Sequence, residues 1–203
     1  QSILWTDMKR HSDLMKEVSG RMDDIQQALN QARRAASVSD LNSSKGATDD
    51  DVLSGVRVAD LLDAETRILL GALFLHCADV SNPTKDWDVC ERWSVLVMNE
   101  FFSQGDVERK LGHQISMNCD RGTVSIPKSQ VGFGQFVIRS LFELLARLSY
   151  TSGERSLQRF EENFKKWQEL AKQETATGRR YRSSLRPPTR EGGWLGKLRE
   201  GEE

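Results

Sequence analysis

The sequence is poor in the two residue types that most often build compact metal sites and covalent crosslinks. Its 203 residues include three histidines and three cysteines: His11, His76, His113, Cys77, Cys90 and Cys119. No HxxxH, HxH, HD or CxxC pair occurs among them, which excludes the common local metal motifs and a fully paired disulfide framework. We therefore expect reduced thiols in an intracellular, cytoplasmic protein.

Charge of one sign and long apolar runs are also missing. Lysine and arginine number 29 against 30 aspartates and glutamates, so the net charge of −1 gives no electrostatic argument for a nucleic-acid partner. No apolar run is long enough for a transmembrane segment, and the start of the chain lacks the features of a signal peptide. Because Gln1 opens directly onto helix-like sequence, we interpret the chain as part of a longer protein. Nothing in the pattern indicates its oligomeric state.

Apolar residues recur at spacings of three and four, and no strand-like alternation extends beyond a few residues. We expect an all-α chain forming a compact multi-helix bundle. The expected helices span residues 3–29, 58–78, 86–104, 131–148 and 154–172. The second is too apolar in its interior to lie on a surface. The inner face expected for the third comprises Val89, Trp93, Leu96, Val97, Phe101 and Phe102.

Composition also suggests how the chain is organised. Residues 1–173 are expected to form one domain, or part of one. Residues 35–57, rich in serine, aspartate and glycine, are predicted to be a flexible loop or insertion. Residues 174–203 are predicted to be a disordered tail.

One carboxylate interrupts the most apolar segment. The stretch LHCADVSNPTKDW, residues 75–87, places Asp79 at the end of the expected second helix, just before Asn82-Pro83. A buried carboxylate is costly unless it is paired, hydrogen-bonded or bound to a metal. Asp79 is then either one ligand of a hard cation whose other ligands lie elsewhere, or a structural partner of His76 or of nearby backbone. The residues alone favour the structural alternative.

Three blocks in order make a more specific signal: LHCADVSNPTK, RWSVLVMNEFFSQGDVE and SQVGFGQFVI. Together they resemble the catalytic domain of class I cyclic nucleotide phosphodiesterases. ILWTDM resembles the preceding block of that family, although Trp5 stands where the family usually has a small residue. The resemblance covers residues 3–170 except 35–57.

The resemblance implies that residues 1–173 are the C-terminal part of an all-α catalytic domain, which hydrolyses 3′,5′-cyclic nucleotides, cAMP or cGMP or both, to 5′-monophosphates in signal transduction. It implies two divalent ions, a tightly held zinc and a magnesium or manganese. A bridging water or hydroxide attacks the cyclic phosphate, and a histidine protonates the leaving O3′. The substrate-binding residues it implies are Asp79, Asn82, Val97, Gln130 and Phe133, with Met8, Phe101 and Asn118 as further pocket-lining residues.

Each implied role has a physical basis. Asp79 matches the family's metal-ligand aspartate. The amide of Gln130 offers a donor and an acceptor to the purine edge, Phe133 stacks on the base, Val97 forms the opposite apolar wall, and Asn82 also faces the base. Without the family, Val97, Phe101 and Met8 would be read as core residues, Asn82 as a turn residue and Gln130 as part of a helix N-terminus.

The chain also departs from the family pattern. The general-acid histidine and three further metal ligands belong to blocks that are missing here, so we expect them upstream and expect this chain alone to be inactive. The alternatives are a catalytically dead relative that binds nucleotide or a partner, or a helical interaction module with accidental matches. Cys90 replaces a tyrosine that orients the glutamine in some cAMP-selective relatives, which leaves the choice between cAMP and cGMP open.

Overall fold

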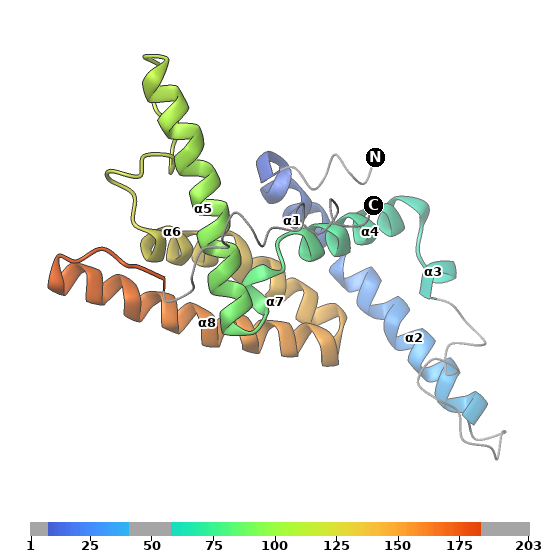
Figure 1. Cartoon of the computed structure of the whole chain (residues 1–203). Coiled ribbons are helices and arrows are strands. Elements are labelled where there is room, and N and C mark those ends of the chain that lie inside the picture. The colour runs from blue at the N-terminus through green and yellow to red at the C-terminus, as the bar shows by residue number, and fades with distance from the viewer. Residues whose placement is uncertain (1–7, 41–57, 184–203) are drawn as a thin grey trace, which may run out of the picture. The chain divides into compact units, whose positions relative to one another are not determined.

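The computed structural model describes residues 8–40 and 58–183. Every regular element in these two ranges is helical, which confirms the prediction of an all-α, multi-helix chain (Figure 1). The chain divides into two compact units. Unit 1 comprises Gln1–Lys85 and Gly132–Phe164, and unit 2 comprises Asp86–Val131 and Lys165–Glu203.

Unit 1 begins with short and medium helices. Its elements are η2 (Met8–Arg10), α1 (His11–Gly20), α2 (Met22–Asp40), α3 (Val58–Leu61), α4 (Ala64–Asp79), η3 (Asn82–Thr84), η4 (Gly134–Ile138), α7 (Arg139–Leu148) and the first half of α8 (Tyr150–Thr177). Unit 2 contains α5 (Trp87–Lys110), most of α6 (Ile126–Phe133) and the second half of α8.

The expected helix over residues 3–29 is wrong in its continuity, because α1 and α2 are separated at Arg21. Backbone angles at Arg21 leave the helical region (φ −104°, ψ 6°), after a glycine of low helix propensity at position 20. The Arg21 guanidinium bonds Thr66 Oγ1 at 3.1 Å and Glu65 at 2.8 Å, so the break ties α1 to the start of α4. α2 continues to Asp40, past the expected start of the loop at residue 35. Residues 41–57 of that loop lie outside the described residues.

The expected helix over residues 58–78 is divided at Asp63, which caps α4. Its carboxylate accepts from the backbone N–H of Thr66 at 2.9 Å and from the Thr66 hydroxyl at 2.6 Å. Burial is limited to one side of α4, through Leu69, Ala72, Leu73, His76 and Cys77. Ile68, Phe74 and Leu75 are 39–48% exposed, so the interpretation of α4 as too apolar for a surface is wrong.

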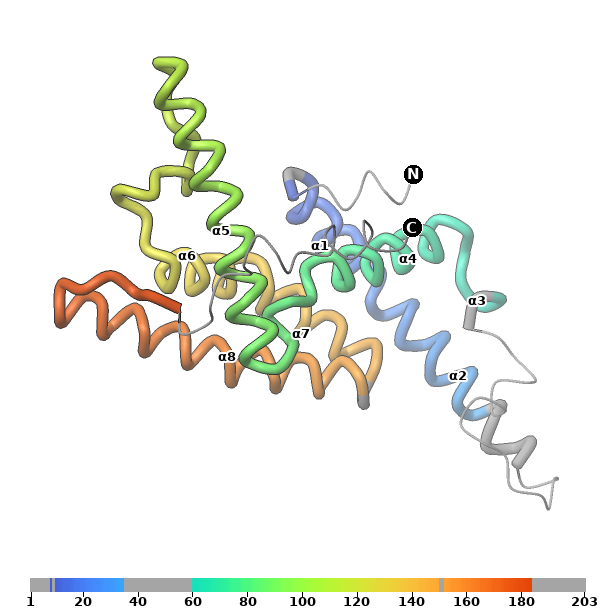
Figure 2. Tube along the Cα trace, in the orientation of Figure 1, coloured from blue at the N-terminus to red at the C-terminus, as the bar shows by residue number. Residues whose placement is uncertain are grey.

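One helical path runs from Ile126 to Leu148, five residues longer at its start than expected, and passes through the π-helical turn η4 (Figure 2). Gly134 opens this turn against α8. A Cβ atom at this position would lie 2.7 Å from the ring of Phe164, so only glycine permits the close approach. Arg139 lies over the same ring at 5.0 Å and pairs with Glu161.

The inner face expected for α5 is wrong except at Phe102. The buried side of α5 consists of Cys90, Glu91, Ser94, Met98, Phe102 and Gly105. By contrast Val89, Trp93, Leu96, Val97 and Phe101 are 37–53% exposed. Gly105 shows why the small residues face inward, because a Cβ atom there would lie 2.0 Å from the carbonyl oxygen of Cys119.

The end of the described chain is ordered by contacts within unit 2. α8 continues to Thr177, past the expected start of the tail at residue 174. Gly178 then adopts φ +65°, and residues 178–183 run back along α8 (Figure 1). Residues 184–203 lie outside the described residues. Within the described ranges no helix combines the length and the apolar character that crossing a membrane requires.

Candidate functional site

Asp79 is the last residue of α4 and is exposed. The sequence interpretation treated this carboxylate as buried, and that premise is wrong. An exposed carboxylate is solvated and needs no buried partner. The argument for Asp79 as a metal ligand therefore rests on the family resemblance, together with its accessible position at the end of the helix.

His76, one turn earlier on α4, is fully buried and bonds a residue that the sequence reasoning overlooked. Its Nε2 lies 3.0 Å from Nδ1 of His11 on α1. Burial lowers the pKa of His76, opposed by the nearby Asp79 carboxylate, and burial followed by His76 lowers the pKa of His11. Both imidazoles are therefore mainly neutral at pH 7, and their pairing is a packing contact between two helices. The partner of His76 is therefore His11, and not Asp79 as in the structural alternative that the sequence offered.

The surroundings of Asp79 do not amount to a complete metal site. In the part of the chain that the structure describes, no three His, Cys, Asp or Glu side chains come together to hold a metal ion. Asp79 offers carboxylate oxygens suited to a hard divalent cation. It fits the role of a single ligand, and a binuclear centre would need further ligands from outside the described residues.

The turn after Asp79 is held by another residue that sequence reasoning missed. Asn82 begins η3 and is half-buried, and the following Pro83 is buried. From α8, the buried amide of Asn163 donates to the carbonyl of Pro83 at 2.9 Å and to that of Lys85 at 2.7 Å. These two bonds fix the backbone that follows Asp79. An asparagine within an apolar stripe was the available signal.

Gln130 and Phe133 lie one turn apart on α6, and both are half-buried. Gln130 is anchored from α5, where the buried Ser94 hydroxyl lies 3.0 Å from Gln130 Oε1. The Ser94 hydroxyl also lies 2.8 Å from the carbonyl oxygen of Cys90. Ser94, rather than the Cys90 thiol, thus contacts the amide. Burial raises the pKa of Cys90, so its sulfur remains protonated.

The remaining candidates are accessible. Val97 and Phe101 on α5 and Met8 in η2 are 37–44% exposed, so none is a core residue here. Asn118 is exposed and has φ +66°. By unit, the candidates divide into Met8, Asp79, Asn82 and Phe133 in unit 1, and Val97, Phe101, Asn118 and Gln130 in unit 2.

Comparisons with known proteins agree with the family resemblance found in the sequence. The family model described as 3′5′-cyclic nucleotide phosphodiesterase matches residues 1–160. A Caenorhabditis elegans protein named probable 3′,5′-cyclic-AMP phosphodiesterase pde-4 is 32% identical over 177 residues, covering 87% of this chain and 22% of that protein. The Drosophila melanogaster 3′,5′-cyclic-AMP phosphodiesterase, isoform F, is 46% identical over 104 residues, covering 51% of this chain and 16% of that protein.

A solved structure, that of LmjPDEB1 in complex with IBMX, has a similar fold. The TM-score is 0.61 at 22% identity, over 84% of this chain and 42% of that chain. This chain therefore spans less than half of the solved chain, and about a fifth of the length of the curated relatives (22% and 16%).

Proposed function

Because this chain belongs to the 3′,5′-cyclic nucleotide phosphodiesterase family, we propose that it forms part of a catalytic domain that hydrolyses cyclic nucleotides to 5′-nucleoside monophosphates in signal transduction. The names of both curated relatives specify cyclic AMP. We propose cyclic AMP as the preferred substrate and cyclic GMP as the alternative substrate. The buried unpaired thiols fit an intracellular, cytoplasmic location.

The structural observation that best supports this proposal is the anchored amide of Gln130. With Oε1 next to the Ser94 hydroxyl, the amide nitrogen has no other partner within the described ranges and can donate to an acceptor on a purine edge. Phe133, one turn along α6, supplies a half-exposed ring for stacking on the base. We assign Val97 to the apolar wall on the other side of the base from Phe133, and we assign Asn82 to a position facing the base. Met8, Phe101 and Asn118 are assigned to the pocket lining.

We assign Asp79 as a ligand in a site for two divalent ions, of which one is zinc and the other is magnesium or manganese. When bound, such ions activate water near neutral pH and stabilise charge on the phosphate. The role of this chain is to hold one carboxylate in place, and the bonds from Asn163 to Pro83 and Lys85 support that role by fixing the turn that follows. The other ligands and the general acid are expected from the family's remaining segments.

The test is steady-state kinetics with cAMP and cGMP, on the complete protein that carries this chain. Asp79→Ala is expected to abolish turnover of both nucleotides. Gln130→Ala is expected mainly to raise KM, by roughly fivefold for each hydrogen bond lost at about 1 kcal/mol. Asp13→Ala, at another exposed aspartate, is the matched control and should behave as the parent.

Near-parental turnover of Asp79→Ala would show that this carboxylate is structural. If the complete protein binds cyclic nucleotide but never hydrolyses it, the alternative of a catalytically dead, nucleotide-binding relative would replace the proposal.

A further inference from the structure

The segment 178–183, which we call the strap, lies beyond residues 1–160 that match the family model. It begins at Gly178, whose positive φ reverses the chain after α8. The backbone N–H of Tyr181 donates to Glu174 Oε1 at 2.6 Å, and the Arg180 guanidinium donates to the carbonyls of Arg121 and Gly122. The strap is thus bound through Arg180 and Tyr181 to other residues of unit 2.

The centre of this contact is Glu91 on α5, a carboxylate that is only 4% exposed. It accepts hydrogen bonds from the Tyr181 hydroxyl and, at 2.8 Å, from the Ser183 hydroxyl. Burial, and then the bond to Glu91, raise the pKa of Tyr181, so its phenol remains a neutral donor. The strap hydroxyls stabilise a buried negative charge, which in turn binds the strap.

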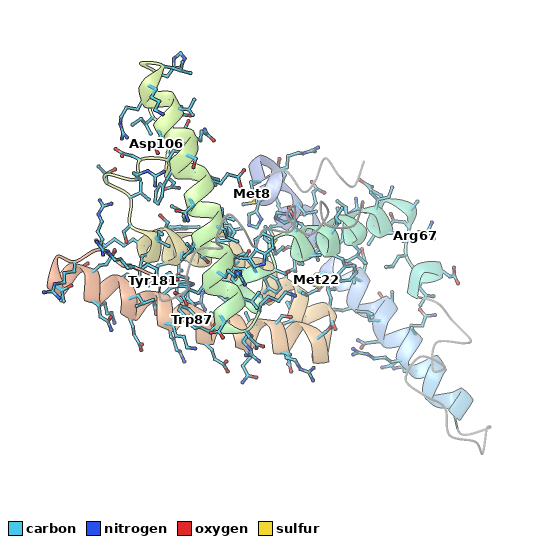
Figure 3. The ribbon with its side chains drawn as sticks, viewed as in Figure 1. Met8, Met22, Arg67, Trp87, Asp106 and Tyr181 are labelled. Atoms are coloured by element: carbon cyan, nitrogen blue, oxygen red, sulfur yellow. The ribbon has the colours of Figure 1, made fainter. Side chains whose placement is uncertain are left out.

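Aromatic contacts complete the docked strap. The Tyr181 ring packs edge-on against Trp167 with centroids 5.8 Å apart, and Trp167 packs on Trp87 at 4.9 Å. Figure 3 labels Tyr181 and Trp87, the two outer members of this row. Release of the strap would therefore change the surroundings of Trp167, which provides an optical signal.

We propose that Ser183 is a phosphorylation site whose modification releases the strap from α5. A phosphoserine carries a charge of about −1.5 to −2 at pH 7 and has lost the hydroxyl proton that Ser183 now donates. Its oxygens would face the Glu91 carboxylate at hydrogen-bond distance without a proton between them. Repulsion between like charges then favours the undocked strap.

The sequence around Ser183 indicates the class of enzyme. Arg179, Arg180 and Arg182 precede it by four, three and one residues, and all three are exposed. Serine kinases that select basic substrates bind such arginines through carboxylates. The Ser183 oxygen attacks the γ-phosphorus of ATP, the bond to ADP breaks, and the hydroxyl proton passes to the kinase base. Because the docked strap engages both Arg180 and Ser183, docking and phosphorylation compete.

The experiment treats the whole chain with ATP and a serine kinase that requires arginine three residues before the serine. Mass spectrometry locates the phosphate, and hydrogen exchange at residues 179–183, with Trp fluorescence, reports docking. We expect phosphate on Ser183 and a rise of about tenfold or more in amide exchange across the strap, as the open population grows. Ser183→Ala should remain unmodified there and docked.

Two variants test the electrostatic cause. Glu91→Gln keeps an acceptor but removes the charge, so phosphate on Ser183 should increase exchange much less than in the parent. Tyr181→Phe loosens the strap without touching Ser183, so phosphorylation should be faster than in the parent.

Three results would overturn the proposal. These are modification of other serines without Ser183, phosphate on Ser183 with unchanged exchange, or equal release in the parent and Glu91→Gln. None of these readouts depends on catalytic activity.

Discussion

Ser94 Oγ lies 3.0 Å from Gln130 Oε1 and 2.8 Å from the carbonyl oxygen of Cys90, and its single proton can serve only one of them fully. If the proton points to Gln130, the amide nitrogen of Gln130 is left for a ligand. If it points to the Cys90 carbonyl, the Gln130 amide forms a hydrogen bond to Ser94 only after a flip that places its own N–H toward the Ser94 oxygen. Ser94 therefore controls which end of the Gln130 amide is left for an outside partner, which in our proposal is the purine edge.

We predict that Ser94→Ala, in the complete protein, raises KM by roughly fivefold, the equivalent of about 1 kcal/mol for one lost hydrogen bond. The ratio of kcat/KM for cAMP to that for cGMP should fall, since the amide can then adopt either orientation. Ser94→Thr, which retains the hydroxyl, is the control. Unchanged KM and unchanged selectivity in Ser94→Ala would show that Ser94 does not orient Gln130.

We predict that this 203-residue chain alone does not hydrolyse cyclic nucleotides, even with zinc and magnesium added. In our proposal Asp79 supplies one ligand, and of the three histidines two are buried against each other. Loss of most ligands should remove the activated water altogether. The measurement is release of 5′-monophosphate from the purified chain, with the complete protein as the positive control. Measurable turnover by the chain alone would refute the requirement for ligands from outside it.

We predict that Gly134→Ala destabilises the chain by about 1–3 kcal/mol, the usual penalty for overpacking. The added methyl would lie 2.7 Å from Phe164 and 3.2 Å from Phe160, and both rings are buried. Gly132→Ala, two residues earlier, is the control. A Cβ atom there meets nothing within 4 Å, so the change should be neutral or stabilising by up to about 1 kcal/mol. The measurement is the free energy of unfolding of both variants in urea. Equal changes in the two variants would contradict the packing argument.

We predict that stability declines as pH falls from 7 toward 5. The folded pKa values of His11 and His76 lie below the ordinary 6.5, so the unfolded chain takes up protons first as pH falls. Stability from these groups is present above pH 6.5 and is lost as pH drops toward the folded values. Each histidine contributes at most about 1.4 kcal/mol per pH unit.

The charged group facing this pair is Asp79, which favours the protonated form of His76 and weakens the effect without reversing it. The measurement is the free energy of unfolding between pH 5 and 8. His11→Asn should flatten the dependence, whereas His113→Gln, at an exposed position, should preserve it. A dependence that His11→Asn leaves intact would assign the effect to other groups.

Helical periodicity predicted which segments are helical, but it missed the breaks at Arg21 and Asp63 and misassigned the faces of α5. The pattern selected the bulky residues Val89, Trp93 and Val97 as the inner side, whereas Cys90, Ser94 and Gly105 face inward. Periodicity shows which residues share a side of a helix, but two sides of α5 carry apolar residues and either could be the buried one. The choice between them depends on close approach, such as the backbone of Cys119 against Gly105, which only tertiary structure reveals.

In the candidate site, too, the local features could be predicted from the sequence and the long-range contacts could not. The motif blocks selected Asp79 and Gln130 as candidates, because each match lies within a short segment of sequence. They did not identify Ser94 as the partner of Gln130, His11 as the partner of His76, or Asn163 as the clamp on the turn after Asp79. Each of these bonds joins residues 36 or more positions apart. The closest in sequence, Ser94 and Gln130, are separated by 36. Helical spacing carries no information at that range.

The π-helical turn Gly134–Ile138 has a consequence for how this region tolerates insertions and deletions. A π turn holds about one residue more than an α turn, and one residue rotates an α-helix by about 100°. Compared with an unbroken α-helix, the π turn therefore rotates the buried stripe of α7, with Leu141 and Phe142, by about that angle relative to Phe133. Deleting one residue here would restore an unbroken α-helix with every hydrogen bond made. It would also rotate Phe133 relative to α7. A deletion that makes the helix regular would therefore move the Phe133 ring from its present position.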